Sequence, residues 1–274
     1  MNAPDLTQAF LLDPTSSFTE FLTRAAPGLL PQPPGSGLAA DLGPTATTIV
    51  AVAARDGVVL AGDRRATMGS MIAQKDIQKV FVADSGSAVG IAGSAGVAID
   101  LVRLFRVELE HYEKIEGAPL TLAGKANRLA SIIRGNLGLA LRGFVVVPLF
   151  VGWDAASGVA RIFSYDATGG CYEETGYQAI GSGSVFAKGS LKKLYRPGAD
   201  LDQAVTICLQ ALFDAADDDS ATAGPDVLRR IYPVLIQVTS AGASQLPEAV
   251  VAAATAAVLT ARAERPDGPQ AGLL

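Results

Sequence analysis

The chain of 274 residues contains a single histidine and only two cysteines. His111 lies in the charged segment 108–114, where the solvent-exposed face of a helix is its ordinary setting. A Ser-His-Asp triad or a multi-histidine metal site would have to use it, so we expect neither. Cys171 and Cys208 do not form a disulfide framework, which fits a reducing compartment. A hydrolase built on this chain would need a base other than imidazole.

Long apolar runs and strongly charged segments are also missing. The longest nearly unbroken apolar run, 144–153, is too short to span a bilayer, and no secretory signal is visible. The net charge is −5 and no basic cluster exceeds two residues, which argues against nucleic-acid binding. Aromatic residues make up only 6%, so Ala, Val, Leu and Ile must build the core of a chain that is 49% hydrophobic. We therefore expect a globular, cytoplasmic protein that binds neither nucleic acid nor a membrane.

The composition changes at residue 47. Residues 1–46 hold seven of the 15 prolines and cannot bury much surface by themselves. Composition alone favours a disordered tail, and the functional alternative is a propeptide removed by cleavage between Ala46 and Thr47. Residues 47–264 then form one domain without an obvious internal boundary. Residues 265–274 are expected to be a disordered C-terminal tail.

The order of the predicted elements indicates the fold class. Strands, two helices, strands, two helices, a strand and a helix do not alternate strictly, which disfavours a parallel doubly wound sheet. The strands are largely apolar on both faces, so both faces must be covered. We therefore predict an α+β fold with two packed antiparallel sheets and helices on both outer faces. The predicted strands are 47–54, 57–62, 79–83, 87–92, 145–152, 159–166, 177–180 and 234–239, and the predicted helices are 94–114, 121–141, 186–194, 201–216 and 247–264.

Four residues at fixed intervals suggest nucleophilic catalysis. Asp63, Lys79 and Gly93 lie 16, 32 and 46 residues beyond Thr47. A threonine with a free α-amine carries a hydroxyl nucleophile and a base on one residue. An ammonium group nearby would lower the pKa of that hydroxyl, a carboxylate would hold the ammonium in place, and a glycine N–H can bind an oxyanion. Taken singly, these residues also suit a strand start, a surface ion pair and a turn.

The segments around these residues, together with two later segments, resemble in order the motifs of proteasome β subunits. The resemblance covers about residues 44–264, and the segments 108–114 and 214–222 are most similar to the actinobacterial form. It implies the four-layer αββα sandwich of N-terminal nucleophile hydrolases. It also implies a threonine-type endopeptidase that is activated by autocleavage before Thr47. The segments that carry the resemblance are 47–51, 61–65, Lys79, 90–93, 181–184 and 217–220.

The resemblance also implies the roles of individual residues. Thr47 is the nucleophile and, through its amine, the base; Asp63 and Lys79 tune it, and Gly93 supplies the oxyanion donor. No cofactor or metal is implied. The residues expected around the Thr47 amine are Ser182, Asp217 and Ser220, with Ser184 as an alternative to Ser182.

The first specificity pocket is expected to be apolar, which predicts cleavage after hydrophobic residues. Thr67 is expected to bind substrate beside this pocket. The positions that match the pocket are Ala66, Ile77, Phe81, Ile91 and Ala95.

The implied assembly is a stack of seven-membered rings. Copies of this chain form the β rings, α-type subunits form the flanking rings, and regulatory ATPases lie outside and deliver unfolded or tagged proteins. One position departs from the family pattern: Ala46 stands where glycine usually precedes the catalytic threonine. Self-cleavage needs a tight backbone turn there, and a Cβ makes such a turn costly. We expect Ala46 to slow or block maturation.

Three alternatives remain open at this stage. Another N-terminal nucleophile hydrolase, such as a bacterial two-ring peptidase, would use the same chemistry. A catalytically silent or precursor-trapped β subunit would serve only to build rings. A nucleotide-binding module could use the glycines of segment 181–184 with Lys188, although no glycine precedes that lysine as a phosphate loop requires.

Overall fold

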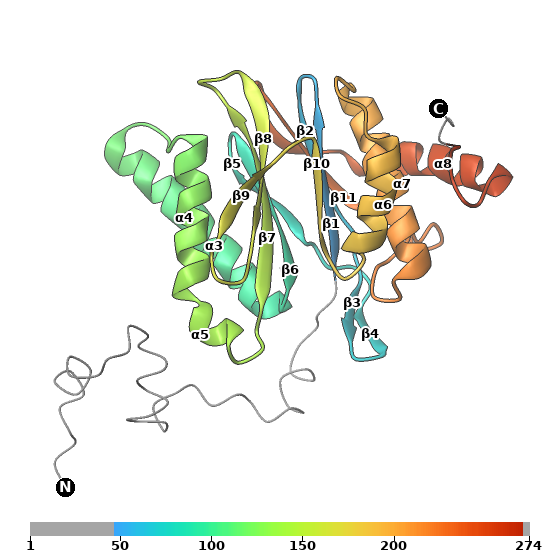
Figure 1. Ribbon diagram of the computed structural model, residues 1–274, viewed down its shortest axis with the longest axis horizontal. Helices are drawn as coiled ribbons and strands as arrows, with labels where there is room; N and C mark the ends of the chain where they lie inside the picture. Colours follow the sequence, from blue (N-terminus) through green and yellow to red (C-terminus); the bar gives the residue numbers. More distant parts are fainter. Residues whose placement is uncertain (1–46, 271–274) are drawn as a thin grey trace, which may run out of the picture.

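The computed structural model describes residues 47–270. The predicted propeptide, including Ala46, and the last four residues lie outside the described range. Two five-stranded sheets pack face to face at the centre of the molecule (Figure 1). Every strand pair within them is antiparallel, as predicted.

The first sheet has the spatial order β10 (Tyr177–Gly181), β1 (Thr48–Ala54), β2 (Gly57–Gly62), β11 (Val234–Thr239) and β12 (Gly242–Gln245). The second has the order β5 (Val80–Asp84), β6 (Ser87–Gly93), β7 (Val146–Asp154), β8 (Val159–Tyr165) and β9 (Cys171–Glu174). A separate hairpin consists of β3 (Ala66–Met68) and β4 (Met71–Gln74).

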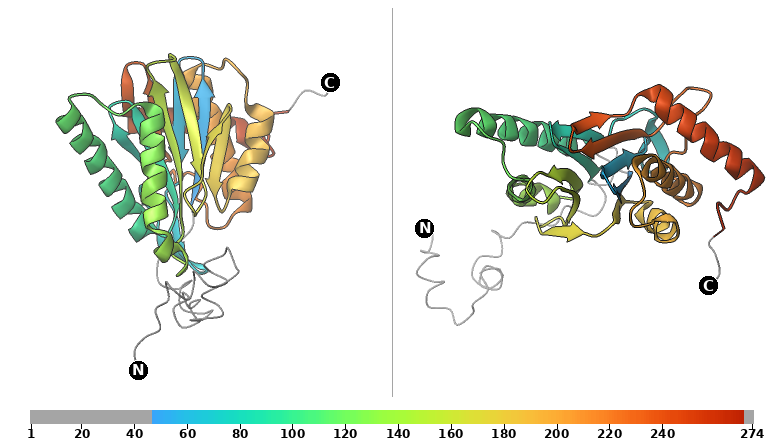
Figure 2. Two further views of the ribbon diagram at one scale, coloured as in Figure 1. Left: turned by 60° about the vertical axis from the view of Figure 1, so that its left-hand side comes forward. Right: turned by 90° about the horizontal axis from the view of Figure 1, so that it is seen from above.

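Helices cover the outer face of each sheet, which completes the predicted four layers (Figures 1 and 2). Helices α3 (Ala95–Glu116), α4 (Leu122–Gly135) and α5 (Leu137–Ala140) lie on the side of the second sheet. Helices α6 (Ser184–Leu194), α7 (Leu201–Asp218) and α8 (Glu248–Glu264) lie on the side of the first. The α+β sandwich expected from the order of elements is confirmed. No helix within residues 47–270 is long and apolar enough to cross a membrane.

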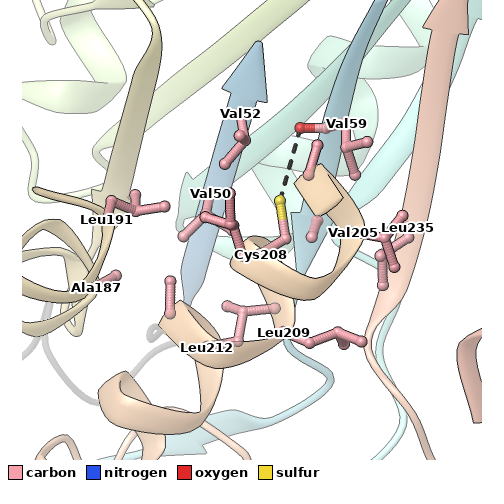
Figure 3. Close-up of a cluster of buried hydrophobic side chains, with 14 of the residues drawn as sticks. Val50, Val52, Val59, Ala187, Leu191, Val205, Cys208, Leu209, Leu212 and Leu235 are labelled. Atoms are coloured by element: carbon pink, nitrogen blue, oxygen red, sulfur yellow. Dashed lines mark hydrogen bonds between the residues drawn. The ribbon is translucent and has the colours of Figure 1, made fainter. Parts of the chain in front are cut away.

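The alternation of side chains along β1 explains why both faces of the strand are apolar. Ile49 and Ala51 point into the layer between the two sheets. Val50 and Val52 point the other way, into the layer beneath α6 and α7. Figure 3 shows this second layer, in which the Sγ of Cys208 on α7 lies 3.9 Å from the carbonyl oxygen of Val59. Complete burial raises the pKa of the Cys208 thiol, so this cysteine packs as a small apolar residue.

Some elements differ from the sequence-based expectation. The strands β3, β4, β9 and β12 are only three or four residues long. Apart from Ala66 and Thr67, their residues are exposed or half-buried, so they lack a strong apolar pattern. The single helix predicted for 121–141 breaks at Asn136, whose side-chain amide donates to the Ile132 carbonyl. Residues 265–270, predicted as part of a disordered tail, are described, and Arg262 Nη1 donates to the Pro266 carbonyl oxygen at 2.9 Å.

Candidate active site

Sheet topology brings four distant residues to one edge of the sandwich. Thr47 immediately precedes β1, and Asp63 immediately follows β2, the antiparallel neighbour of β1. Lys79 precedes β5 and Gly93 ends β6. Thr47, Lys79 and Gly93 line one cavity. Asp63 does not line it but forms an ion pair with Lys79, which does. The four residues that the sequence spacing singled out are therefore neighbours in space.

The carboxylate of Asp63 is buried and accepts four hydrogen bonds. Its Oδ1 accepts from Lys79 Nζ at 2.6 Å and from the Thr48 N–H at 2.9 Å. Its Oδ2 accepts from the backbone N–H groups of Arg65 and Ala223, both at 3.0 Å. A carboxylate with this many donors is held in one orientation. Asp63 is thus a fixed counter-ion for Lys79.

Lys79 is almost completely buried, and the exposed fraction of its side chain is 4%. Burial lowers the pKa of Lys79, and the attraction of Asp63, its hydrogen-bond partner, offsets only part of that effect. The more distant charge of Asp219 also acts to raise the pKa, whereas that of Arg65 acts to lower it. A buried lysine of this kind gives up a proton more readily than an exposed one. Lys79 can therefore act on Thr47 in two ways, through its positive charge and by giving up a proton.

The peptide group between Thr47 and Thr48 is fixed from both sides. The Thr47 carbonyl oxygen accepts from the Ser182 N–H at 2.9 Å, and the Thr48 N–H donates to Asp63. Gly181 permits this approach, because a Cβ there would lie 1.7 Å from the Thr47 carbonyl oxygen. Gly181 also has a φ of 98°, which side-chain-bearing residues rarely adopt. The orientation of Thr47 is therefore set by its backbone neighbours.

The predicted specificity residues lie around the same cavity as Thr47. Ala66, Ile77, Phe81, Ile91 and Ala95 all line it, and Gln78, Ala98 and Ile99 complete the lining. Ala98 and Ile99 are one helical turn beyond Ala95 on α3, so helical spacing would have indicated them. Thr67 is buried on the adjacent strand β3 and is not part of this lining.

Comparison with known proteins shows the family of the chain. Residues 44–228 match the family model described as proteasome subunit. Over 273 residues the chain is 54% identical to the proteasome subunit beta of Streptomyces griseus subsp. griseus, which covers 98% of this chain and 96% of that relative. The chain belongs to the proteasome subunit family. It is a proteasome β-type subunit, and its family is that of the threonine-type endopeptidases.

In this proteasome subunit, two of the residues predicted around Thr47 lie elsewhere, and residues two positions further along the chain take their place. Asp217 is exposed in the last turn of α7, and Ser220 is exposed and presents its carbonyl oxygen to Arg65. The residue that turns inward is Asp219, which follows the end of the helix and whose Oδ2 accepts from Ser182 Oγ at 2.6 Å. Thr222 Oγ1 donates to the same oxygen at 2.6 Å. The prediction of Asp217 and Ser220 is thus corrected to Asp219 and Thr222.

The error has a specific cause. An aspartate followed three residues later by a hydroxyl side chain occurs both at 217–220 and at 219–222, so spacing does not fix the register. Only the end of α7 at Asp218 decides which carboxylate faces Ser182. The structure also distinguishes Ser182 from Ser184. Ser182 makes the hydrogen bond to Asp219, whereas Ser184 is the first residue of α6.

The charge of Asp219 is stabilised by its hydrogen bonds. Partial burial acts to raise the pKa of this carboxyl group, but hydrogen bonds from Ser182, Thr222 and the Ala221 N–H hold the pKa below its ordinary value, helped by the charge of Lys79. The proteasome subunit therefore holds an ionised Asp219 on the Ser182 side chain, and the backbone N–H of Ser182 binds the Thr47 carbonyl. His111 is exposed on α3, and no group of histidine, cysteine or acidic residues within 47–270 could hold a metal ion.

Proposed function

We propose that this β-type subunit is a catalytic subunit of the proteasome core particle, with Thr47 as its nucleophile. The observation that carries the proposal is the buried ion pair beside Thr47: Lys79 Nζ lies 2.6 Å from Asp63 Oδ1, and Lys79 lines the cavity that Thr47 also lines. A subunit that served only to build rings would have no need of a buried charge at this place, because such a charge is costly to bury.

The first step is self-cleavage. The Thr47 hydroxyl attacks the carbonyl carbon of Ala46, its proton passes to a nearby base, and the peptide C–N bond breaks as an ester to Thr47 Oγ forms. The nitrogen of Thr47 gains the proton and becomes a free amine. Water then hydrolyses the ester, which releases residues 1–46 and restores the hydroxyl.

Substrate hydrolysis repeats this chemistry with the amine as base. Thr47 Oγ attacks the scissile carbonyl carbon while the α-amine accepts the hydroxyl proton. The Gly93 N–H stabilises the oxyanion, and Lys79 stabilises the developing charge on Thr47 Oγ. The amine passes its proton to the leaving nitrogen as the C–N bond breaks, and water hydrolyses the acyl ester. Asp219 and Ser182 orient the amine.

The maturation step tests the nucleophile and the effect of Ala46 together. The intact mass of the chain, co-produced with an α-type proteasome subunit, should correspond largely to uncleaved residues 1–274. An Ala46→Gly variant should yield residues 47–274 at least about tenfold faster, because glycine reaches the turn geometry that a Cβ makes costly. Equal maturation rates would refute the expected effect of Ala46. A mass that shows cleavage at another bond would refute the assignment of Thr47.

The apolar cavity supports cleavage after hydrophobic residues. In a chain that also carries Ala46→Gly, Ile77→Glu places a carboxylate on the cavity wall, so peptides with lysine at the cleaved position should be hydrolysed faster relative to peptides with leucine. We expect the ratio of their kcat/KM values to rise by about tenfold or more. Val159→Glu adds the same charge at an exposed position of β8 outside the lining and should leave the ratio unchanged. An unchanged ratio in Ile77→Glu would mean that another surface selects the substrate.

We further propose that the subunit assembles with copies of itself in a seven-membered ring, flanked by rings of α-type subunits. Regulatory ATPases would supply unfolded or tagged proteins. The name of the Streptomyces relative, a proteasome subunit beta, supports this assembly. Exposed apolar side chains on α3, at Leu104, Val107 and Ile115, also suit a chain that is covered by partners. A silent structural subunit would assemble in the same way but would not yield the mass of residues 47–274 even when it carries Ala46→Gly.

A further inference from the structure

Thr48 binds Asp63 directly and is connected to Asp219 through Thr222. It is completely buried at the start of β1. Its N–H donates to the Asp63 Oδ1, the same oxygen that binds Lys79. Its Oγ1 lies 2.6 Å from Thr222 Oγ1, which in turn donates to Asp219. One residue therefore joins the Asp63–Lys79 pair to the Asp219–Ser182 pair.

The hydroxyl protons in this group can be assigned by counting donors. Thr222 has one hydroxyl proton and donates it to the Asp219 carboxylate, which is only an acceptor. The short contact between the two threonine oxygens then requires the Thr48 hydroxyl to donate to Thr222. Thr48 Oγ1 itself accepts from the Gly183 N–H at 3.0 Å. The result is a directional chain from Gly183 through Thr48 and Thr222 to Asp219, in which each bond strengthens the next.

The backbone at Gly183 lies close to the Thr48 hydroxyl. A Cβ at Gly183 would lie 2.4 Å from Thr48 Oγ1 and 2.7 Å from Thr222 Oγ1. Glycine at 183 thus allows its N–H to approach the hydroxyl of Thr48. The adjoining N–H, that of Ser182, donates to the Thr47 carbonyl. The loop that binds the Thr48 hydroxyl is therefore the same loop that fixes the Thr47 backbone and supplies the Ser182 side chain.

We propose that Thr48 is a positioning residue for the Thr47 nucleophile, acting through its side-chain hydroxyl. This inference rests on the proposed catalytic role of Thr47. The Thr48 N–H bond is available to any residue at this position except proline, so it does not explain why a threonine stands here. The hydroxyl does, because it fixes Thr222 and the Gly183 loop relative to β1. Without it, Thr222 and the Gly183 N–H lose their hydrogen bonds to β1, and the Asp219 and Ser182 side chains are held less firmly beside Thr47.

The test compares three variants of the full chain, each carrying Ala46→Gly and co-produced with an α-type subunit. Thr48→Val removes the hydroxyl but keeps the side-chain shape. Thr48→Ser keeps the hydroxyl. Thr255→Val makes the same chemical change at a buried threonine of α8, away from the site. Intact mass confirms maturation, and hydrolysis of a leucine-containing peptide gives kcat and KM separately.

We expect Thr48→Val to lower kcat about 10- to 100-fold with little change in KM, since small displacements of catalytic groups reduce rate rather than binding. Thr48→Ser should restore most of the lost kcat, and Thr255→Val should match the parent. If Thr48→Val does not mature while Thr48→Ser does, the Thr48 hydroxyl is needed already at the self-cleavage step, in which Thr47 is also the nucleophile. If Thr48→Val does not assemble, Thr48→Ala takes its place, because it leaves a space instead of adding a methyl group.

A second measurement does not depend on activity. Hydrogen exchange of the segment around Gly183 is compared in Thr47→Ala and in Thr47→Ala with Thr48→Val. Loss of the acceptor for the Gly183 N–H should make this segment exchange faster. Equal kcat in Thr48→Val and the parent, or equal exchange in the two Thr47→Ala proteins, overturns the positioning role alone. Peptidase activity that survives Thr47→Ala overturns the proposed function, and with it this inference.

Discussion

In a chain that carries Ala46→Gly, Thr47→Ala is expected to abolish maturation and peptidase activity together. Alanine keeps the backbone and the start of β1 but removes the hydroxyl that attacks both Ala46 and the substrate. We expect peptide hydrolysis to fall by about 10⁴-fold or more, because loss of a covalent nucleophile removes the entire acyl-ester route. Intact mass should show residues 1–274 even when Ala46→Gly is present. Peptide hydrolysis and mass are measured on the same preparation, co-produced with an α-type subunit.

The matched control is Thr45→Ala, which makes the same change two residues earlier. Thr45 is a nucleophile only by residue type, so its replacement should alter neither the cleavage site nor the activity of a chain that also carries Ala46→Gly. A Thr47→Ala protein that still matures would assign self-cleavage to another group. A Thr47→Ala protein that stays full-length but hydrolyses peptides would separate the two reactions, which the proposed mechanism joins.

Much of the fold could be predicted because apolar side chains alternate along the central strands. β2 and β11 were predicted with their observed bounds, since each is a Val- and Leu-rich run between turn residues. Asp56-Gly57 is a typical hairpin-turn pair, and it joins β1 to β2. The hairpin β3–β4 was not predicted, because its residues are mostly exposed in the monomer and carry no periodic apolar signal. The local sequence pattern therefore predicts the long strands of the two central sheets better than the short strands of the hairpin.

The site was partly predictable for a different reason. Thr47, Asp63, Lys79 and Gly93 occupy strand ends, and the spacing of strand ends is set by the lengths of the strands between them. Asp219 lies after a helix, where a shift of two residues leaves the sequence pattern intact, and only the end of α7 resolves it. The role of Thr48 could not be read from sequence, because its partners are 15, 135 and 174 residues away.

The second large effect is expected at Asp63. An Asp63→Asn variant has one oxygen to serve the Lys79 and Thr48 donors, and its NH₂ group then faces the N–H groups of Arg65 and Ala223. The ammonium of Lys79 loses its counter-ion in a buried site. Removing one partner of a buried ion pair destabilises proteins by about 3–5 kcal/mol, so the melting temperature should fall clearly. In a chain that also carries Ala46→Gly, we expect kcat to fall by about 10²-fold or more, because Lys79 is no longer held against Thr47.

The matched control for Asp63→Asn is Asp56→Asn. Asp56 forms an ion pair with Arg55 at 3.0 Å, but both side chains are more than 60% exposed. Its replacement should leave both the melting temperature and kcat unchanged. An unchanged melting temperature and kcat in Asp63→Asn would show that the buried pair neither stabilises the fold nor serves catalysis.

A double variant separates these two contributions of the ion pair. Lys79→Met removes the buried charge and keeps much of the side-chain length, so Asp63→Asn with Lys79→Met leaves no unpaired ammonium. The double variant should therefore be more stable than Asp63→Asn alone, because the stranded charge causes most of the destabilisation. Its kcat should stay as low as that of either single variant, since no ammonium remains beside Thr47. Recovery of both stability and kcat would mean that Lys79 acts only through the fold, whereas recovery of stability alone assigns the ammonium to the chemistry.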